Sequence, residues 1–269
     1  MQRLNNNKNN IDMKNIIPIL GLLFIIYGFK SAIISENEDS TILEVHKISQ
    51  NMLLGGWKST LKDKDGNEFT GVTIITEGYL SRAHFNKDKK EFQRSFGGSW
   101  RLENNKIIGT YEFDTYDSTK AGSEFTYEFS IKGNTLTGSN GELWTRIDSG
   151  KPGKLEGAWL ITGRKRNGEI SRSTPGERKT MKILSGTRFQ WIAYHTGTGK
   201  YFGTGGGTYT TRNGKYTENI EFFSRDGSRV GANLQFDYKL DSGEWHHSGF
   251  SSKGDPLYEI WTPRSMLDK

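Results

Sequence analysis

Apolar and polar residues alternate in short segments through the second half of the chain. These segments cover residues 155–163, 181–194, 207–212, 216–224, 233–240, 244–250 and 256–263. Alternation with a period of two is typical of strands that bury one face. Asn213-Gly214 and Asp226-Gly227 lie between segments, where hairpin turns are expected. Because no helical segment intervenes, the pattern predicts an antiparallel barrel or sandwich and excludes a parallel α/β sheet.

The same pattern occurs twice along the chain. With a shift of 109 positions, residues 75–85 (ITEGYLSRAHF) align with residues 184–194 (LSGTRFQWIAY). Outside this block the shift changes, because Trp57 corresponds to Trp159 at a shift of 102. Copies of this length contain enough strands to close on themselves, so they are predicted to be two domains of one fold. The predicted division is residues 1–32 as signal peptide or N-terminal anchor, 33–52 as polar lead, 53–148 as first barrel, 149–154 as linker and 155–265 as second barrel.

An uncharged apolar run near the N-terminus predicts export. Residues 16–29 follow Lys14 and precede Lys30-Ser31-Ala32, which is the layout of a secretory signal, and the run is short for a membrane span. The leader before Met13 is rich in asparagine, and Met13 is an alternative start. We therefore expect an exported protein, periplasmic or secreted, that is membrane-anchored if this segment is not cleaved.

The amino-acid composition excludes several kinds of site and partner. The chain contains no cysteine, which excludes disulfides, thiolate metal ligands, a cysteine nucleophile and a lipidated N-terminal cysteine. The net charge is +6, and residues 150–269 contain 19 Lys and Arg against 12 Asp and Glu. Because the basic residues are scattered through turns, they are interpreted as a solvated surface, and no nucleic-acid partner is expected.

Several motifs of the second copy resemble a known group of domains. WLITG (159–163), GTGGGTYT (203–210) and LYEIWTPR (257–264) are similar to the lipocalin-like domains of unknown function found in exported Bacteroidetes proteins. The resemblance covers nearly all of residues 155–264 and, through the repeat, more faintly residues 53–147. It implies a small closed barrel with a central cavity, and it implies no known activity. The predicted fold class is therefore all-β, with two tandem lipocalin-like antiparallel up-and-down β-barrels.

The ligand site is predicted in the second copy, where aromatic side chains could stack on a ligand. The first copy has Arg82, His84, Trp100 and Tyr111 at positions that the second fills with other residues, so one functional barrel and one supporting barrel are expected. The sequence does not decide which face of strand 188–195 lies inside. The candidate ligand-binding residues are Trp159, Arg188, Gln190, Trp191, Tyr209, Glu218, His247 and Trp261.

The predicted function is to hold a small apolar, amphipathic or sugar ligand, lipid-like or carbohydrate, in the second barrel. The alternative is a small-barrel enzyme, a lyase, isomerase or hydrolase acting on a carbohydrate or lipid. Its candidate catalytic residues are Glu218 and His247 as an acid–base pair, with Tyr209. A third interpretation, a structural or adaptor module, applies if both barrels are packed solid.

Other chemistry finds little support in the sequence. Glu221 is interpreted as structural because Glu112 matches it in the first copy. His246 and His247 are adjacent in a strand and point to opposite faces, so no metal site is expected, and no cofactor is expected either. There is no G-x-S-x-G nucleophile motif and no lysine of a phosphate-binding loop.

The glycine run at 205–207 is predicted to bend a strand. No helix follows it, which argues against a phosphate-binding loop. Gly206 and Gly207 have glycine counterparts in the first copy, so they are assigned to a strand bend or bulge of the barrel wall. Gly205 replaces Phe96, and this loss of a ring is predicted to open space beside Tyr209.

Overall fold

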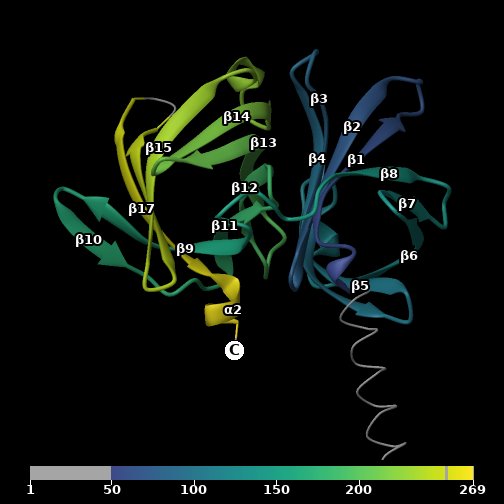
Figure 1. Cartoon of the computed structure of the whole chain (residues 1–269), viewed down its shortest axis with the longest axis horizontal. Helices are drawn as coiled ribbons and strands as arrows, with labels where there is room; N and C mark the ends of the chain where they lie inside the picture. The colour runs from purple at the N-terminus through teal and green to yellow at the C-terminus, as the bar shows by residue number, and fades with distance from the viewer. Residues whose placement is uncertain (1–49, 252–253, 269) are drawn as a thin grey trace, which may run out of the picture. The chain divides into compact units, whose positions relative to one another are not determined.

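The computed structural model describes residues 50–251 and 254–268, and these residues form two closed antiparallel barrels (Figure 1). The predicted all-β fold of tandem barrels is confirmed. The predicted signal peptide, residues 1–32, and most of the predicted polar lead lie outside the described residues. The two barrels together belong to one compact unit that begins at Ser49.

Each strand of the first barrel pairs with its neighbour in sequence, and the last strand closes on the first. Its strands are β1 (Gly55–Lys62), β2 (Glu68–Thr76), β3 (Tyr79–Asn86), β4 (Glu91–Glu103), β5 (Lys106–Asp114), β6 (Glu124–Lys132), β7 (Thr135–Gly138) and β8 (Leu143–Asp148). One 3-10 turn, Ser118–Lys120, follows β5. This up-and-down order gives each strand an interior face and an exterior face.

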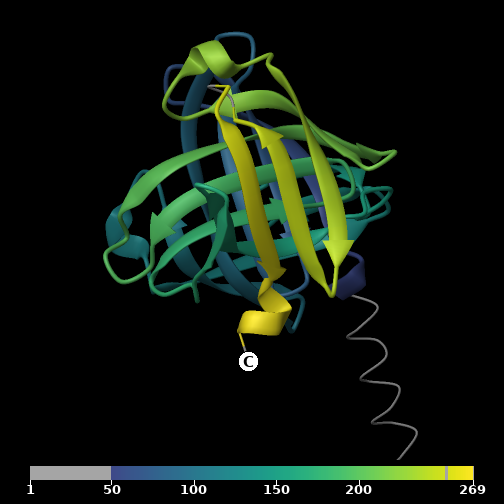
Figure 2. The same cartoon turned by 90° about the vertical axis from the view of Figure 1, so that its left-hand side faces the viewer.

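The second barrel repeats this order with one additional strand, β10, which pairs only with β9. Its elements are β9 (Gly157–Arg166), β10 (Glu169–Arg172), β11 (Arg178–Leu184), β12 (Arg188–His195), β13 (Tyr201–Arg212), β14 (Lys215–Phe223), a 3-10 turn (Gly227–Arg229), β15 (Asn233–Asp241), β16 (Glu244–Phe250), β17 (Pro256–Pro263) and α2 (Arg264–Leu267). Strand β17 closes on β9 and leads directly into α2 (Figure 2).

Three details of the second barrel differ from the predicted strands. Strand β13 begins at Tyr201, six residues before the predicted segment 207–212. The segment 181–194 is two strands, because the chain turns at residues 185–187, where the Ser185 amide donates to the Arg188 carbonyl at 2.9 Å. Apolar residues on both sides of this tight turn give the sequence one continuous pattern. Strand β10 was not predicted, since all four of its residues are exposed and lack alternation.

Matching hydrogen bonds occur at matching positions of the two barrels. The Trp57 indole donates to the Leu53 carbonyl at 2.8 Å, and the Trp159 indole donates to the Leu155 carbonyl at 3.0 Å. Each bond fixes the first tryptophan of its barrel against the residues that precede the first strand. The two copies therefore share side-chain anchors as well as strand order.

The glycine run bends the barrel wall, as predicted. Pairing between β13 and β14 shifts register between Gly206 and Gly207, and pairing between β4 and β5 shifts between Gly97 and Gly98. A Cβ on Gly207 would overlap the backbone carbonyl of Asn219. Any larger residue would separate the two strands at this bulge.

The two barrels contact each other through equivalent residues. Phe85 stacks on Phe222 with ring centroids 4.8 Å apart, and Phe113 packs on Tyr194 at 5.0 Å. The shift of 109 positions converts the first pair into the second, so residue i contacts residue j and the equivalent of j contacts the equivalent of i. This reciprocity is the property of a two-fold symmetric dimer interface. Near its centre, Gln190 Nε2 donates to hydroxyls of both barrels.

Asp148, the last residue of β8, ties the first barrel to the β11–β12 turn of the second. Its carboxylate accepts hydrogen bonds from the Gly56 and Gly186 amides at 3.2 and 2.9 Å and from the Ser185 hydroxyl at 2.8 Å. Burial alone would raise the pKa of this carboxyl, but the hydrogen bonds, led by that of Thr187, lower it. The link therefore depends on an ionised aspartate.

Candidate functional site

The first barrel contains an internal cavity of about 180 Å³. Its lining comes from six strands and is mainly aromatic and aliphatic. The lining residues are Thr73, Ile75, Leu80, Arg82, Phe96, Ile107, Tyr111, Phe125, Thr126, Tyr127 and Trp144. Several of the rings, including Phe96 and Tyr111, are partly exposed, so the cavity is partly open to solvent. A small ring compound fits these dimensions and this lining.

Arg82 provides the charged group of the cavity and is held by three partners. Its guanidinium pairs with the Glu142 carboxylate and also donates to the Ser59 hydroxyl at 3.1 Å and to His84 Nε2 at 2.9 Å. It also lies over the Trp144 ring, 4.6 Å from the centroid. Because every nitrogen of Arg82 already has a partner, the side chain forms a fixed polar wall.

The pKa values of the titratable groups around Arg82 are shifted from their ordinary values. Burial and the neighbouring Arg82 charge lower the pKa of His84 to about 3, so the imidazole is neutral at physiological pH. Burial alone would raise the pKa of Glu142, but its bonds with Arg82 lower it, so the carboxylate is ionised. Burial also raises the pKa of Tyr127 to about 12, and its hydroxyl has no hydrogen-bond partner among the described residues.

The second barrel has larger polar residues where the first has small ones. The repeat places Lys182 at the position of Thr73 and Glu218 at the position of Gly109. Lys182 Nζ donates to Glu218 Oε1 at 2.8 Å, and both side chains are 6% exposed. The ammonium is surrounded by aromatic rings, with Tyr216 and two tryptophans among them at 4.9 to 5.4 Å from their centroids. In the first barrel the Phe125 ring covers Gly109, and Thr73 lines the cavity.

A second polar pair lies in the same interior. His247 Nδ1 lies 3.4 Å from Glu259 Oε2, and the Glu259 carboxylate also accepts from the Trp261 indole at 3.2 Å. Burial and the Lys182 charge lower the pKa of His247, so this imidazole is neutral. On the outer side, Glu259 Oε1 lies 3.7 Å from Arg164 Nε. Glu259 thus connects the interior to the barrel rim.

The structure divides the predicted ligand-binding residues between two faces. Those in the interior of the second barrel are Trp159, Trp191, Tyr209, Glu218, His247 and Trp261. Arg188 and Gln190 lie on the opposite face of β12. Arg188 pairs with Glu221, and Gln190 donates to Ser95 of the first barrel. Sequence reasoning missed Lys182 and Glu259, since a charged residue in a strand usually marks the solvent face.

The three candidate catalytic residues each have a separate partner. Glu218 pairs with Lys182 and His247 with Glu259, while the Tyr209 hydroxyl donates to the Ser185 carbonyl at 2.6 Å. Among the hydrogen bonds of the described residues, none joins two of the three. Tyr209 instead repeats the structural bond that the Trp100 indole makes to the Thr76 carbonyl in the first barrel.

The space beside Gly205 is occupied. A Cβ on Gly205 would lie 2.8 Å from Trp191 Nε1 and 2.9 Å from Phe223 Cδ2. Trp191 stands where the first barrel has Arg82, so its indole fills the place of the lost Phe96 ring. The predicted opening at this position is therefore absent. The ring that is lost at Gly205 is compensated by the larger side chain of the neighbouring Trp191.

Residues 50–251 and 254–268 contain neither a metal-binding cluster nor a membrane-spanning helix. No group of three or more histidine, aspartate or glutamate side chains in these ranges could hold a metal ion. Within the same ranges no helix has the length and hydropathy needed to cross a bilayer.

No protein-family model matches the sequence, and a comparison with curated proteins finds no match. The lipocalin-like resemblance and its functional implications therefore stay predictions.

Proposed function

We propose that the chain is an exported, lipocalin-like ligand-binding protein that holds a small, mostly apolar ring compound inside the first barrel. The observation that carries the proposal is the cavity of about 180 Å³ with its aromatic lining. A cavity of about 150 Å³ with apolar walls is enough to bind benzene.

The sequence favoured the second barrel, and the proposal moves the ligand to the first. Aromatic side chains are abundant in both interiors, so they do not distinguish the barrels. The distinction comes from the buried Lys182–Glu218 ion pair of the second interior, because the first has only the small Thr73 at the position of Lys182 and the apolar Phe125 ring over Gly109. The enzyme alternative gains no support from the geometry, because Glu218 and His247 are not hydrogen-bonded to each other in the described residues.

Thermal unfolding in the presence of a small ligand panel tests this proposal. The panel contains indole, p-cresol, palmitate and glucose, which represent the apolar, amphipathic and sugar classes. A ligand present at ten times its Kd stabilises the folded state by about 1.4 kcal/mol, which raises Tm by several degrees. We expect stabilisation by indole or p-cresol. The absence of stabilisation by all four compounds would contradict the proposal.

A pair of variants on β5 locates the site. Ile107→Phe adds a ring inside the cavity, at a position where the second barrel already carries Tyr216. Ile108→Phe adds the same ring on the adjacent, outward-facing position and serves as the control. The first variant should abolish the indole-induced Tm shift and the second should retain it. Equal binding by both variants would place the ligand elsewhere.

Export is part of the proposal and has its own test. It is supported by the apolar run at residues 16–29 in the layout of a secretory signal. Expression of the full chain in a Gram-negative host should give a mature protein in the periplasm or medium that begins near residue 33. A full-length protein retained at the membrane would support an uncleaved anchor instead.

A further inference from the structure

A cleft that has no counterpart in the first barrel opens beside the β9–β10 hairpin of the second. Trp57 and Trp159 are 102 positions apart, whereas Ile75 and Leu184 are 109 apart, so seven additional residues lie between β9 and β11. In the first barrel, β1 pairs with β2 along its whole length. In the second, β9 pairs with β11 only up to Leu160 and pairs with β10 beyond Gly163.

This divergence leaves a hollow of about 450 Å³ between β10 and β11. The β9–β10 hairpin projects from the barrel wall in Figure 1. We call the hollow the arginine cleft, and its lining residues are Ile161, Gly163, Arg164, Arg166, Ser171, Ser173, Thr174, Pro175, Gly176, Arg178 and Thr180. It is large enough to enclose a molecule the size of a sugar.

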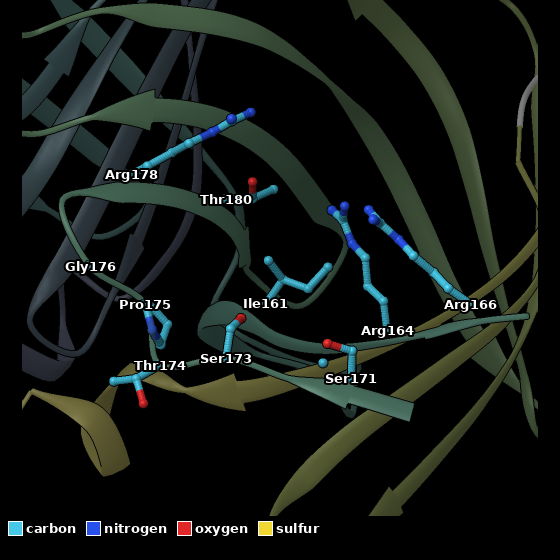
Figure 3. A pocket seen from close by; sticks show the side chains of 11 residues that line it. Ile161, Arg164, Arg166, Ser171, Ser173, Thr174, Pro175, Gly176, Arg178 and Thr180 are labelled. Carbon is cyan, nitrogen blue, oxygen red and sulfur yellow. The ribbon is translucent and has the colours of Figure 1, made fainter. Parts of the chain in front are cut away.

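Three guanidinium groups supply the charge of the cleft. Arg164 and Arg166 extend in the same direction from β9, and Arg178 belongs to β11 (Figure 3). No carboxylate is among the lining side chains. Neighbouring positive charges attract an anion, and a planar guanidinium binds carboxylate or phosphate through two parallel hydrogen bonds.

The three arginines differ in whether their guanidinium groups already contact other residues of the protein. Arg164 lies 3.7 Å from Glu259 through its Nε atom, which leaves its terminal nitrogens available. The Arg178 guanidinium lies over the Phe202 ring, 4.5 Å from the centroid, which fixes its position without using its hydrogen bonds. Arg166 has no hydrogen bond or ion pair with any described residue. Arg166 is therefore the strongest candidate for direct contact with an anion.

The other lining residues indicate the chemical character of the uncharged part of the ligand. Hydroxyl groups come from Ser171, Ser173, Thr174 and Thr180, whereas the apolar lining side chains are limited to Ile161 and Pro175. Hydroxyl-rich walls complement a hydroxylated ligand and give little stabilisation to an apolar one. We infer that the arginine cleft is a second binding site, specific for an anionic sugar whose carboxylate or phosphate contacts the arginines.

Isothermal titration calorimetry with the full chain tests this inference. Glucuronate and glucose 6-phosphate are the anionic probes, and glucose is the neutral one. We expect at least one anionic sugar to bind and glucose not to bind. Binding by glucuronate alone would assign a carboxylate ligand, and binding by glucose 6-phosphate alone would assign a phosphate ligand. Failure of both, or equal affinity for glucose, would overturn the inference.

Matched arginine variants separate a built site from general attraction to a basic surface. Arg166→Gln should weaken anionic sugar binding at least tenfold, because a hydrogen bond to a charged group contributes at least a factor of ten in affinity. Arg212→Gln removes an exposed arginine at the end of β13, away from the cleft residues, and should leave the affinity within twofold. Equal loss in both variants would overturn the inference. Indole binding to the first barrel, measured on the same proteins, reports separately on the proposed function.

Discussion

The two barrels share a frame but differ in what fills them. Both have the same strand order, the same tryptophan anchors and the same glycine bulge. Inside, the first barrel has Thr73 and Gly109 where the second has the Lys182–Glu218 ion pair. The comparison teaches that one barrel frame accepts either a mainly apolar cavity lining or a buried ion pair in its interior.

The second barrel tolerates its buried charges because they are paired and surrounded by rings. An isolated ammonium or carboxylate in an apolar interior would cost several kcal/mol, but a hydrogen-bonded pair offsets most of that cost. The faces of Tyr216, Trp245 and Trp261 contribute further cation–π attraction to Lys182. The interior of the second barrel is thus destabilised when one member of the pair is removed alone.

The largest effect is expected from removing one member of this pair. Glu218→Gln leaves the Lys182 ammonium buried without a counter-ion, so it should lower the free energy of unfolding by about 3 kcal/mol. Urea denaturation measures the change. Glu128→Gln is the matched control, because Glu128 pairs with Lys106 on the surface and should cost less than about 1 kcal/mol.

Replacement of both members sharpens this test. Lys182→Met combined with Glu218→Leu removes both charges and keeps similar volume, so the double variant should be more stable than Glu218→Gln. If the double variant were the less stable of the two, the ion pair would be stabilising in itself, and the argument from an uncompensated charge would be wrong.

A pH-dependent difference is expected from the first barrel. His84 has a pKa of about 3 in the folded protein, below the ordinary value near 6.5, so the unfolded chain binds more protons between these values. The stabilisation is complete above pH 6.5 and decreases as the pH falls toward 3. Between pH 7.5 and pH 5 the wild type should lose about 2 kcal/mol through this group.

The variant His84→Ala introduces the residue that the second barrel has at this position, Ala193. Its stability should decrease less steeply than that of the wild type over the same pH range, while groups common to both proteins cancel. Denaturation curves at pH 7.5, 6 and 5 provide the measurement. Parallel pH profiles for the two proteins would show that His84 is protonated to the same extent in folded and unfolded chains.

The smallest effect is expected at Gly205. Gly205→Ala brings a methyl group within 3 Å of the side chains of Trp191 and Phe223, which can shift, so the cost should be about 1 kcal/mol. Gly207→Ala is the comparison, because its methyl group would meet a backbone carbonyl of the β13–β14 ladder and should cost more. Equal Tm values for the two variants would contradict the argument that the Trp191 side chain can shift to accept the methyl group.

Much of the frame could be predicted from local pattern. The strand segments, the repeat and the glycine bulge follow from alternation, self-similarity and turn chemistry, which depend on residues close in sequence. The exposed strand β10 was not predicted because its residues do not alternate. The turn at residues 185–187 was not predicted because apolar residues flank it on both sides.

The candidate site was less predictable because it depends on which positions face each other across a barrel. Arg188 and Gln190 have the same alternation as an interior face, yet they lie against the first barrel, whose surface supplies the burial. The Lys182–Glu218 pair joins residues 36 positions apart. Neither residue reveals its partner in the sequence, so the barrel with the buried ion pair could not be identified in advance.

The contact made by Gln190 distinguishes a fused pair from two identical subunits. Its amide reaches both the Ser95 and Thr204 hydroxyls, which are equivalent positions of the two copies, while its own equivalent is the smaller Ser81. In a dimer of identical chains, symmetry would place the same residue at this point twice and double every change in volume. Covalent fusion removes that restriction, so each half can change its interior independently while the shared contact surface stays intact.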